Sequence, residues 1–411
     1  MWLVNFSTMA TGNLSFGLFV LPMGGALGMD RSQFGWAVTT RRMAAGLSSY
    51  FVGRLLDRYG PRVLIPVSGI IIGLGLIAIS RANAPWQVIV LFGVLGMTGL
   101  AAPQNIMTSV PVAKWFQQKR GLALALATSG LGLGGVFFLP ITQLLIGAVG
   151  WRSTWLVMAV VFMALSVPLS AMFLRRQPED MGLQTDGRTA ATAAETGQPN
   201  AEVEEQSWTV RQAFRTATMW KLLLAFGLAG VAQGGASVHR IPYWIEKGFD
   251  PQVVSYSFAA DAGGAATMAL FAGWLADRIP IRVIGAGSFV GLSFAIGLML
   301  IGRNEYFLFG STITFGLSVG AGMIVQSYLF AAYFGRTFLG SIRGIVMPFM
   351  LISAGIGAPL VGYIRDATGS YVSSWWLILS IYLVAALIMS SARRPTPLST
   401  GQETSQGTPS L

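Results

Sequence analysis

The stretch GRLLDRYGPR at residues 53–62 recurs as GWLADRIPIR at residues 273–282, an offset of 220 residues between the two copies. The pairs Gly28/Gly248 and Asp30/Asp250 keep this offset, so the repeat includes the long apolar segment before each charged turn. A repeat of this length is too long for a solenoid unit. It is typical of the two homologous halves of a membrane transporter. The repeat therefore predicts two helical bundles with a binding site between them.

The composition places the chain in a membrane. Of its 411 residues, 53% are hydrophobic and only 10% are charged, whereas soluble domains carry about 25% charged residues. The net charge of +11 comes mostly from short loops between apolar segments, as expected of orientation signals rather than of a nucleic-acid surface. The absence of cysteine excludes disulfides, thiol catalysis and cysteine-ligated metal sites. The first apolar segment begins almost at Met1, and we interpret it as a first span rather than a cleaved signal peptide.

Apolar segments of about 20 residues, enough to cross a bilayer, predict an all-α membrane protein. Twelve transmembrane helices are expected, at 2–27, 32–54, 63–81, 85–113, 121–147, 152–174, 217–242, 251–275, 283–301, 306–332, 344–364 and 371–392. They predict two six-helix pseudo-symmetric bundles at 1–174 and 217–392. The polar stretch between them predicts a cytoplasmic linker at 175–216, and residues 393–411 predict a disordered cytoplasmic tail.

The basic residues outside the spans fall unequally on the two sides of the predicted membrane. One side collects eighteen of them: Arg54, Arg58, Arg62, Lys114, Lys119, Arg120, Arg175, Arg176, Arg188, Arg211, Arg215, Lys221, Arg278, Arg282, Arg336, Arg343, Arg393 and Arg394. The other side collects six: Arg31, Arg81, Arg152, Lys247, Arg303 and Arg365. Because positive loops stay inside, we expect a multi-pass plasma-membrane protein with both termini in the cytoplasm.

The repeated turn resembles the signature of the major facilitator superfamily between spans 2 and 3, although Pro61 stands where that signature usually has a basic residue. Other stretches resemble bacterial monocarboxylate-transporter-like proteins, relatives of the oxalate/formate antiporters. These stretches are KWFQQKRGLA (114–123), RRQPEDMGL (175–183), HRIPY (239–243), YFGR (333–336) and DATGSY (366–371). The resemblance implies secondary transport of small carboxylates, often together with a proton. It also implies that spans 1, 4, 7 and 10 line a central cavity.

One departure from the family pattern concerns the anion site. Animal monocarboxylate transporters carry an Asp and an Arg about one helical turn apart in span 8. The corresponding places here fall near Ala265 and Ala269, and span 8 contains Asp261 but no Arg. The family's anion site therefore cannot be transferred residue by residue.

Charged residues within spans are rare because each costs roughly 3 kcal/mol or more at the helix centre. Here they are Arg41, Arg42, Arg240 and Asp261. Arg41 and Asp261 are related by the 220-residue offset, so they are expected at equal depth, ~15 Å below the outer surface. We expect them to meet across the central axis or to share a water-filled cavity, as a gate or substrate site. The alternative is a structural pair. Of the two neighbouring arginines, we expect Arg41 to face the cavity.

Further polar residues could contact a substrate. The only histidine, His239, could relay a proton together with Asp261 or bind a carboxylate, or it could be a satisfied interfacial residue. Arg240 could anchor an anion or snorkel to the surface. On the spans that the resemblance places around the cavity, the remaining substrate-binding candidates are Gln104, Asn105, Gln326, Tyr328 and Asn13. Each of these could instead bond to a neighbouring helix.

The repeated turns are expected to act as a conformational lock. Its residues are Gly53, Asp57, Arg58, Arg62, Asp277 and Arg278. By analogy with the family, they hold the cytoplasmic side closed in the outward-open state. The alternative, topology signalling alone, explains the arginines but not the repeated Gly and Asp. No spacing indicates a metal site, a catalytic cluster or a cofactor motif, and the glycines between 130 and 135 favour close helix packing.

The sequence thus predicts a secondary active transporter of a small organic anion, with a monocarboxylate and proton symport favoured. It is expected to work by alternating access, as a monomer in contact with membrane lipid, without a cofactor or nucleic acid. The alternatives are an anion exchanger of the oxalate/formate type, an exporter of amphipathic or cationic compounds that uses Asp261, and a transporter-like sensor. An enzyme is not expected.

Overall fold

The computed structural model describes residues 1–12, 14–98, 100, 106–115, 120–175, 208–276, 278–334 and 339–395. The first half contains α1 (Trp2–Thr8), the 3₁₀ helix η1 (Met9–Thr11), α2 (Phe16–Leu27), α3 (Arg31–Tyr59), α4 (Pro61–Ser80), α5 (Pro85–Met97), α6 (Ile106–Trp115) and α7 (Arg120–Phe173). The second half contains α8 (Val210–Phe214), α9 (Ala217–Glu246), α10 (Pro251–Ala276), α11 (Ile281–Ile301), α12 (Glu305–Phe334), α13 (Leu339–Thr368) and α14 (Val372–Ser391).

These helices confirm an all-α fold of twelve membrane crossings, although helices and crossings do not match one to one. Span 1 is divided into α1, η1 and α2 by the left-handed Gly12, with φ of 75°. Helix α7 contains spans 5 and 6, and the chain turns between them at Gly150, whose φ of 79° is the left-handed conformation that favours glycine. Within the described residues, eight helical stretches are long and apolar enough to cross a membrane.

The predicted linker is not structureless throughout. Thr209 caps α8 by accepting a hydrogen bond from the Gln212 amide, and the preceding Trp208 donates its backbone N–H to the Phe334 carbonyl at the end of α12. The end of the linker is therefore packed against the second bundle. Residues 176–207 and the tail from 396 onward lie outside the described residues.

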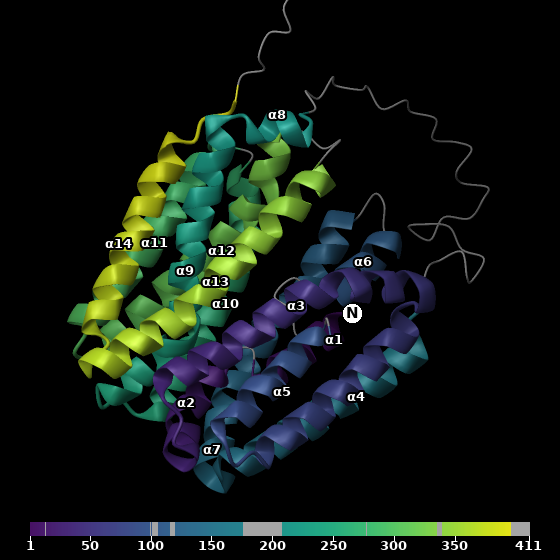
Figure 1. Cartoon of the computed structure of the whole chain (residues 1–411), viewed down its shortest axis with the longest axis vertical. Helices are drawn as coiled ribbons and strands as arrows, with labels where there is room; N and C mark the ends of the chain where they lie inside the picture. Colours follow the sequence, from purple (N-terminus) through teal and green to yellow (C-terminus); the bar gives the residue numbers. More distant parts are fainter. Residues whose placement is uncertain are drawn as a thin grey trace, which may run out of the picture.

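The helices of the two halves form two neighbouring bundles, purple to blue for the first and teal to yellow for the second (Figure 1). Each bundle has a buried core that consists mostly of its own residues. In the first half α4 packs on α7 and α3 on α5, and in the second α9 packs on α13 and α10 on α12. Across the boundary α3 packs against α13, α7 against α10 and α2 against α9. We call the α3–α13 and α7–α10 contacts the two seams. They are equivalent under the sequence repeat, because α3 and α10 carry its two copies.

The α3–α13 seam is antiparallel and very close. Gly35 lies so near α13 that an added Cβ would be 2.5 Å from the Ala358 carbonyl carbon, so only glycine fits there. Further along, Thr39 donates to the Gly355 carbonyl, and Gly46 faces Leu351. The α7–α10 seam uses the same device, since a Cβ on Gly132 would lie 2.6 Å from the Ala266 side chain.

The seams are tight only over part of their length. We call the end of the molecule that carries Arg31 the outer end and the end that carries Arg58 the inner end, following the predicted orientation. Toward the inner end, no described atom lies within 4 Å of a Cβ built on Gly53 of α3 or on its repeat counterpart Gly273 of α10. The two halves therefore touch from the outer end to about the middle of α3 and α10 and separate toward the inner end.

Candidate functional site

A polar face of α9 lies at the centre of the molecule. Gln233, Ser237 and Arg240 fall within about 60° of one another around the helix, at about 100° per residue. Ser237 is exposed and Gln233 half-buried, although they lie midway along a helix that is mostly buried. Side chains from three other helices bond to this face, and we call these residues and their partners the α9 site.

Arg240 and Asp261 form an ion pair in the second half. Arg240 Nη1 donates to Asp261 Oδ2 at 2.8 Å, from α9 to α10. The guanidinium carbon lies 3.5 Å from the ring centre of Phe315 and 4.7 Å from that of Phe258, within cation–π range. Arg240 is 4% exposed, so it does not snorkel to the surface. Its Nη2 is buried and has no hydrogen-bond partner among the described residues, which leaves a donor for an anion.

The expected pair of Arg41 and Asp261 is wrong in this conformation. Arg41 stays within the first half, where its Nη1 and Nη2 donate to the carbonyl and hydroxyl oxygens of Thr11, at 3.3 and 3.0 Å. The physical reason is that each residue bonds to the first helix of its own bundle, span 1 for Arg41 and span 7 for Asp261. Equal depth does not bring the two charges together.

Arg42, rather than Arg41, reaches across the boundary between the halves. Its Nη1 donates to the Ala354 carbonyl of α13 at 2.9 Å, and its Nη2 donates to the Ser237 hydroxyl of α9 at 3.1 Å. The side chain is half-buried, whereas Arg41 is 5% exposed. The expectation that Arg41 faces the central space is therefore corrected in favour of Arg42.

Sequence reasoning missed Gln233, Ser237 and Tyr382 of this site, and it also missed Thr11, which lies outside it. Tyr382 of α14 donates its hydroxyl to Gln233 at 3.0 Å, and Thr11 holds Arg41. Ser237 accepts from Arg42 and donates to the Gly234 carbonyl of its own helix. The signal that could have revealed Gln233 and Ser237 is their position on the same helical face as Arg240.

His239 is occupied on both ring nitrogens. Nε2 lies 2.9 Å from the Ala358 carbonyl, which can only accept, so Nδ1 accepts from the Tyr371 hydroxyl at 3.2 Å. The ring is fully buried and turned away from the α9 polar face toward α13 and α14. This geometry agrees with the alternative of a satisfied, structural histidine.

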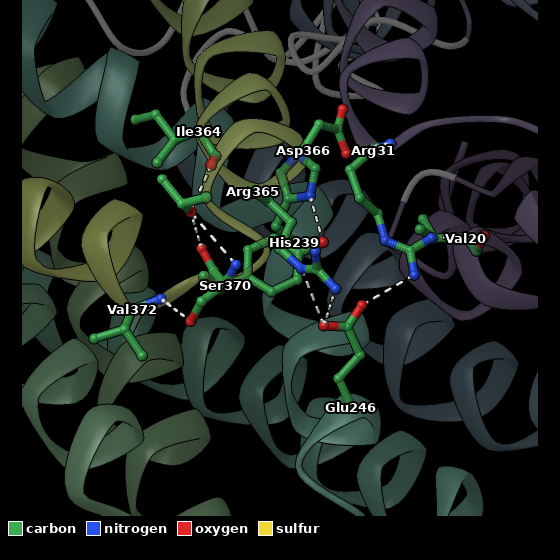
Figure 2. A network of polar contacts seen from close by, with 11 residues as sticks. Val20, Arg31, His239, Glu246, Ile364, Arg365, Asp366, Ser370 and Val372 are labelled. Carbon is green, nitrogen blue, oxygen red and sulfur yellow. Dashed lines mark hydrogen bonds and ion pairs between the residues drawn. The ribbon is translucent and has the colours of Figure 1, made fainter.

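An ionic cluster joins the two halves at the outer end (Figure 2). Glu246 at the end of α9 accepts from Arg31 of α3 at 2.9 Å and from Arg365 of α13 at 3.3 Å. The Asp366 carboxylate accepts from the backbone N–H groups of Arg31 and Ser32, at 3.2 and 3.0 Å. A carboxylate of the second half thus caps the first turn of a helix in the first half. The cluster reinforces the outer closure.

Lys247, next to this cluster, fixes the end of another helix. Its Nζ donates to the carbonyls of Met299, Leu300 and Gly302 at the end of α11, where a cation is favourable. Burial and then the neighbouring Arg303 lower the pKa of Lys247.

The lock residues lie at the inner end. Arg62 donates to the Ala171 carbonyl at 3.0 Å, and Arg58 and Arg278 stack on Tyr59 and Trp274. Asp277 and the Asp57 side chain lie outside the described residues. With the inner end separated in this conformation, the proposed cytoplasmic lock is not tested by these contacts.

The other substrate candidates are dispersed. Gln326 contacts Met350 Sδ at 3.3 Å between α12 and α13, and Tyr328 is 45% exposed. Asn13, Gln104 and Asn105 lie outside the described residues.

Comparison with known proteins agrees with this architecture. The sequence model of the Major Facilitator Superfamily matches residues 1–247 and 240–410. The fold is similar to that of a variant of the nucleoside transporter NupG, with a TM-score of 0.75, 13% identity and coverage of 95% of this chain and 98% of the other. A bacterial homologue of the human lysosomal transporter Spinster, solved inward-facing and occupied, has a TM-score of 0.65, 14% identity and coverage of 95% and 92%.

Relatives in sequence are transporters as well. The chain is 27% identical to human monocarboxylate transporter 11, over 96% of this chain and 83% of the relative. It is 24% identical to the uncharacterized MFS-type transporter YcxA of Bacillus subtilis, over 90% and 87%. The chain belongs to the Major Facilitator Superfamily. It is an integral, multi-pass membrane transporter, and not an enzyme.

Proposed function

We propose that this transporter moves a small organic anion, with a monocarboxylate as the favoured substrate, together with a proton. The observation that carries the proposal is the buried, unpartnered Nη2 of Arg240 beside the carboxylate of Asp261. A substrate carboxylate can bond to Nη2 while Asp261 occupies Nη1. The monocarboxylate transporters among the relatives support this substrate class.

Proton coupling follows from competition for one guanidinium. Ionised Asp261 neutralises Arg240, and protonation of Asp261 removes that neutralising charge and favours an anion in its place. Asp261 is the only acid within the membrane-spanning segments, so it is the proposed proton carrier. A cationic substrate would have to displace Arg240 from Asp261, which disfavours the export of cationic compounds. The proposed orientation keeps both termini in the cytoplasm.

Proteoliposomes with an imposed pH gradient and labelled lactate test this proposal. Asp261→Asn should abolish pH-driven accumulation, while residual exchange of labelled lactate becomes insensitive to pH. Glu305→Gln, which removes an exposed acid at the outer end of α12, is the matched control and should behave like the parent. His239→Gln should retain accumulation, because the histidine bonds only to neutral partners. Full accumulation by Asp261→Asn would eliminate Asp261 as the carrier.

A further inference from the structure

The charges within the membrane do not balance. Arg41, Arg42 and Arg240 stand against the single carboxylate of Asp261, which is already paired with Arg240. Arg41 is enclosed in the first half. Arg42 is therefore a cation at the boundary between the halves, and its bonds go to a carbonyl and a hydroxyl oxygen. Neutral acceptors compensate a guanidinium less well than a carboxylate does.

The surroundings of Arg42 are accessible as well as positive. Ser237, to which it donates, is exposed, and two turns beyond the close approach of Gly46 to Leu351, at Gly53, no described atom lies within 4 Å of an added Cβ. The two described bonds use two of the five guanidinium N–H groups. Ser237 is one helical turn from Arg240, so an anion arriving from the inner end meets Arg42 before or together with Arg240.

We propose that Arg42 and Ser237 form a carboxylate-binding subsite at the seam, distinct from the Arg240–Asp261 pair. A carboxylate there takes over N–H groups of Arg42 that now bond to the Ala354 carbonyl and the Ser237 hydroxyl. Its role in handling the transported substrate rests on the proposed function. The positive potential at Ser237 does not depend on the proposed function. The subsite and the proposed function can therefore be tested separately.

The naturally cysteine-free chain allows a direct measurement. Ser237→Cys, a nearly isosteric change, is reacted in detergent with an anionic and a cationic methanethiosulfonate reagent of similar size. The ratio of the two rates is divided by the same ratio at Asn304→Cys, an exposed outer-loop position. We expect the anionic reagent to be preferred by about tenfold, as a unit charge a few ångströms away produces in a medium of intermediate dielectric.

Three arginine variants, two at Arg42 and one at Arg41, then assign the effect. Arg42→Gln should remove the preference, Arg42→Lys should keep it, and Arg41→Gln, the neighbouring control, should leave it nearly unchanged. An equal preference with and without Arg42 would overturn the subsite. If Arg42→Gln does not fold, the Ser237→Cys protein with Arg42 intact still tests the proposal. In that protein, a normalised ratio of anionic to cationic reaction rates near one would overturn the subsite.

Protection by a ligand separates the subsite from the proposed function. Lactate should slow the modification of Ser237→Cys and choline should not. A charge preference that depends on Arg42 but is not accompanied by lactate protection would support the subsite and count against lactate-like monocarboxylates as substrates. Protection that persists in Arg42→Gln would place the anion elsewhere and overturn the subsite.

Discussion

Arg41 of α3 and Asp261 of α10 occupy equivalent positions in the sequence repeat, yet the two halves use them differently. In the first half, Arg41 bonds to the neutral oxygens of Thr11. In the second half, Asp261 pairs with Arg240, whose guanidinium lies against Phe315. The first half thus places an arginine at this position, whereas the second places there the carboxylate that we propose as the proton carrier. The repeat has kept the position and depth of the charge while its chemistry has diverged.

The largest effect expected from this difference is on Arg240. Arg240→Ala should leave the largely buried carboxylate of Asp261, 15% exposed, without its partner and destabilise the protein by about 3 kcal/mol. The double variant Arg240→Ala/Asp261→Ala should recover most of this loss in a detergent thermal-unfolding assay, yet it should not transport. If the double variant is as unstable as Arg240→Ala, the packing of the Arg240 side chain rather than its charge holds the second half.

The halves should behave alike at the inner end, where both copies of the repeat keep a glycine, Gly53 and Gly273. A Phe at Gly53 or Gly273 meets no described atom within 4 Å of its Cβ, so both variants should fold. The proposed alternating access requires these inner ends to approach. Either Phe should then block closure and reduce lactate transport by at least about tenfold, which corresponds to about 1.4 kcal/mol.

Gly287→Phe is the matched control for these two variants. Gly287 is a helical glycine of α11 that also has no described atom within 4 Å, but it is remote from the seams, so transport should survive. Normal transport by Gly53→Phe together with a block in Gly273→Phe would show that only one seam closes.

The repeat and the apolar segments were enough to predict the fold, because bilayer thickness fixes helix length and the offset fixes which helices correspond. The equivalent positions of Arg41 and Asp261 along α3 and α10 were predictable from the offset, but their partners were not. The rotation of each helix about its axis decides whether Arg41 or Arg42 faces the other half, and one residue changes that direction by about 100°. Sequence patterning does not determine this rotation for helices such as α3, which pack on both sides.

The choice of Thr11 as the partner of Arg41 shows the same limit. Thr11 lies in η1, within a stretch that reads as an uninterrupted apolar span, and the left-handed Gly12 ends this 3₁₀ turn. A break of that kind changes which backbone carbonyl is free to accept. Ser237 was missed for a related reason, since a single serine in an apolar helix is ordinary until the opposite half is seen to bond to it.

The smallest effect is expected for Arg41 itself. Replacing Arg41 by an apolar side chain removes the desolvation cost of a buried charge and leaves no opposite charge without a partner, in contrast to breaking a buried pair. Arg41→Met should therefore change the unfolding free energy by no more than about 1–2 kcal/mol, the cost of leaving the Thr11 oxygens unbonded. The pH dependence of lactate transport should stay that of the parent, because Arg41 does not contact Asp261. Measuring the unfolding free energy of Arg41→Met and Arg240→Ala in the same assay compares the two halves directly. A pH profile displaced by Arg41→Met would mean that Arg41 and Asp261 interact in another conformation of the cycle, and the division between a fixed charge and a titrating pair would then fail.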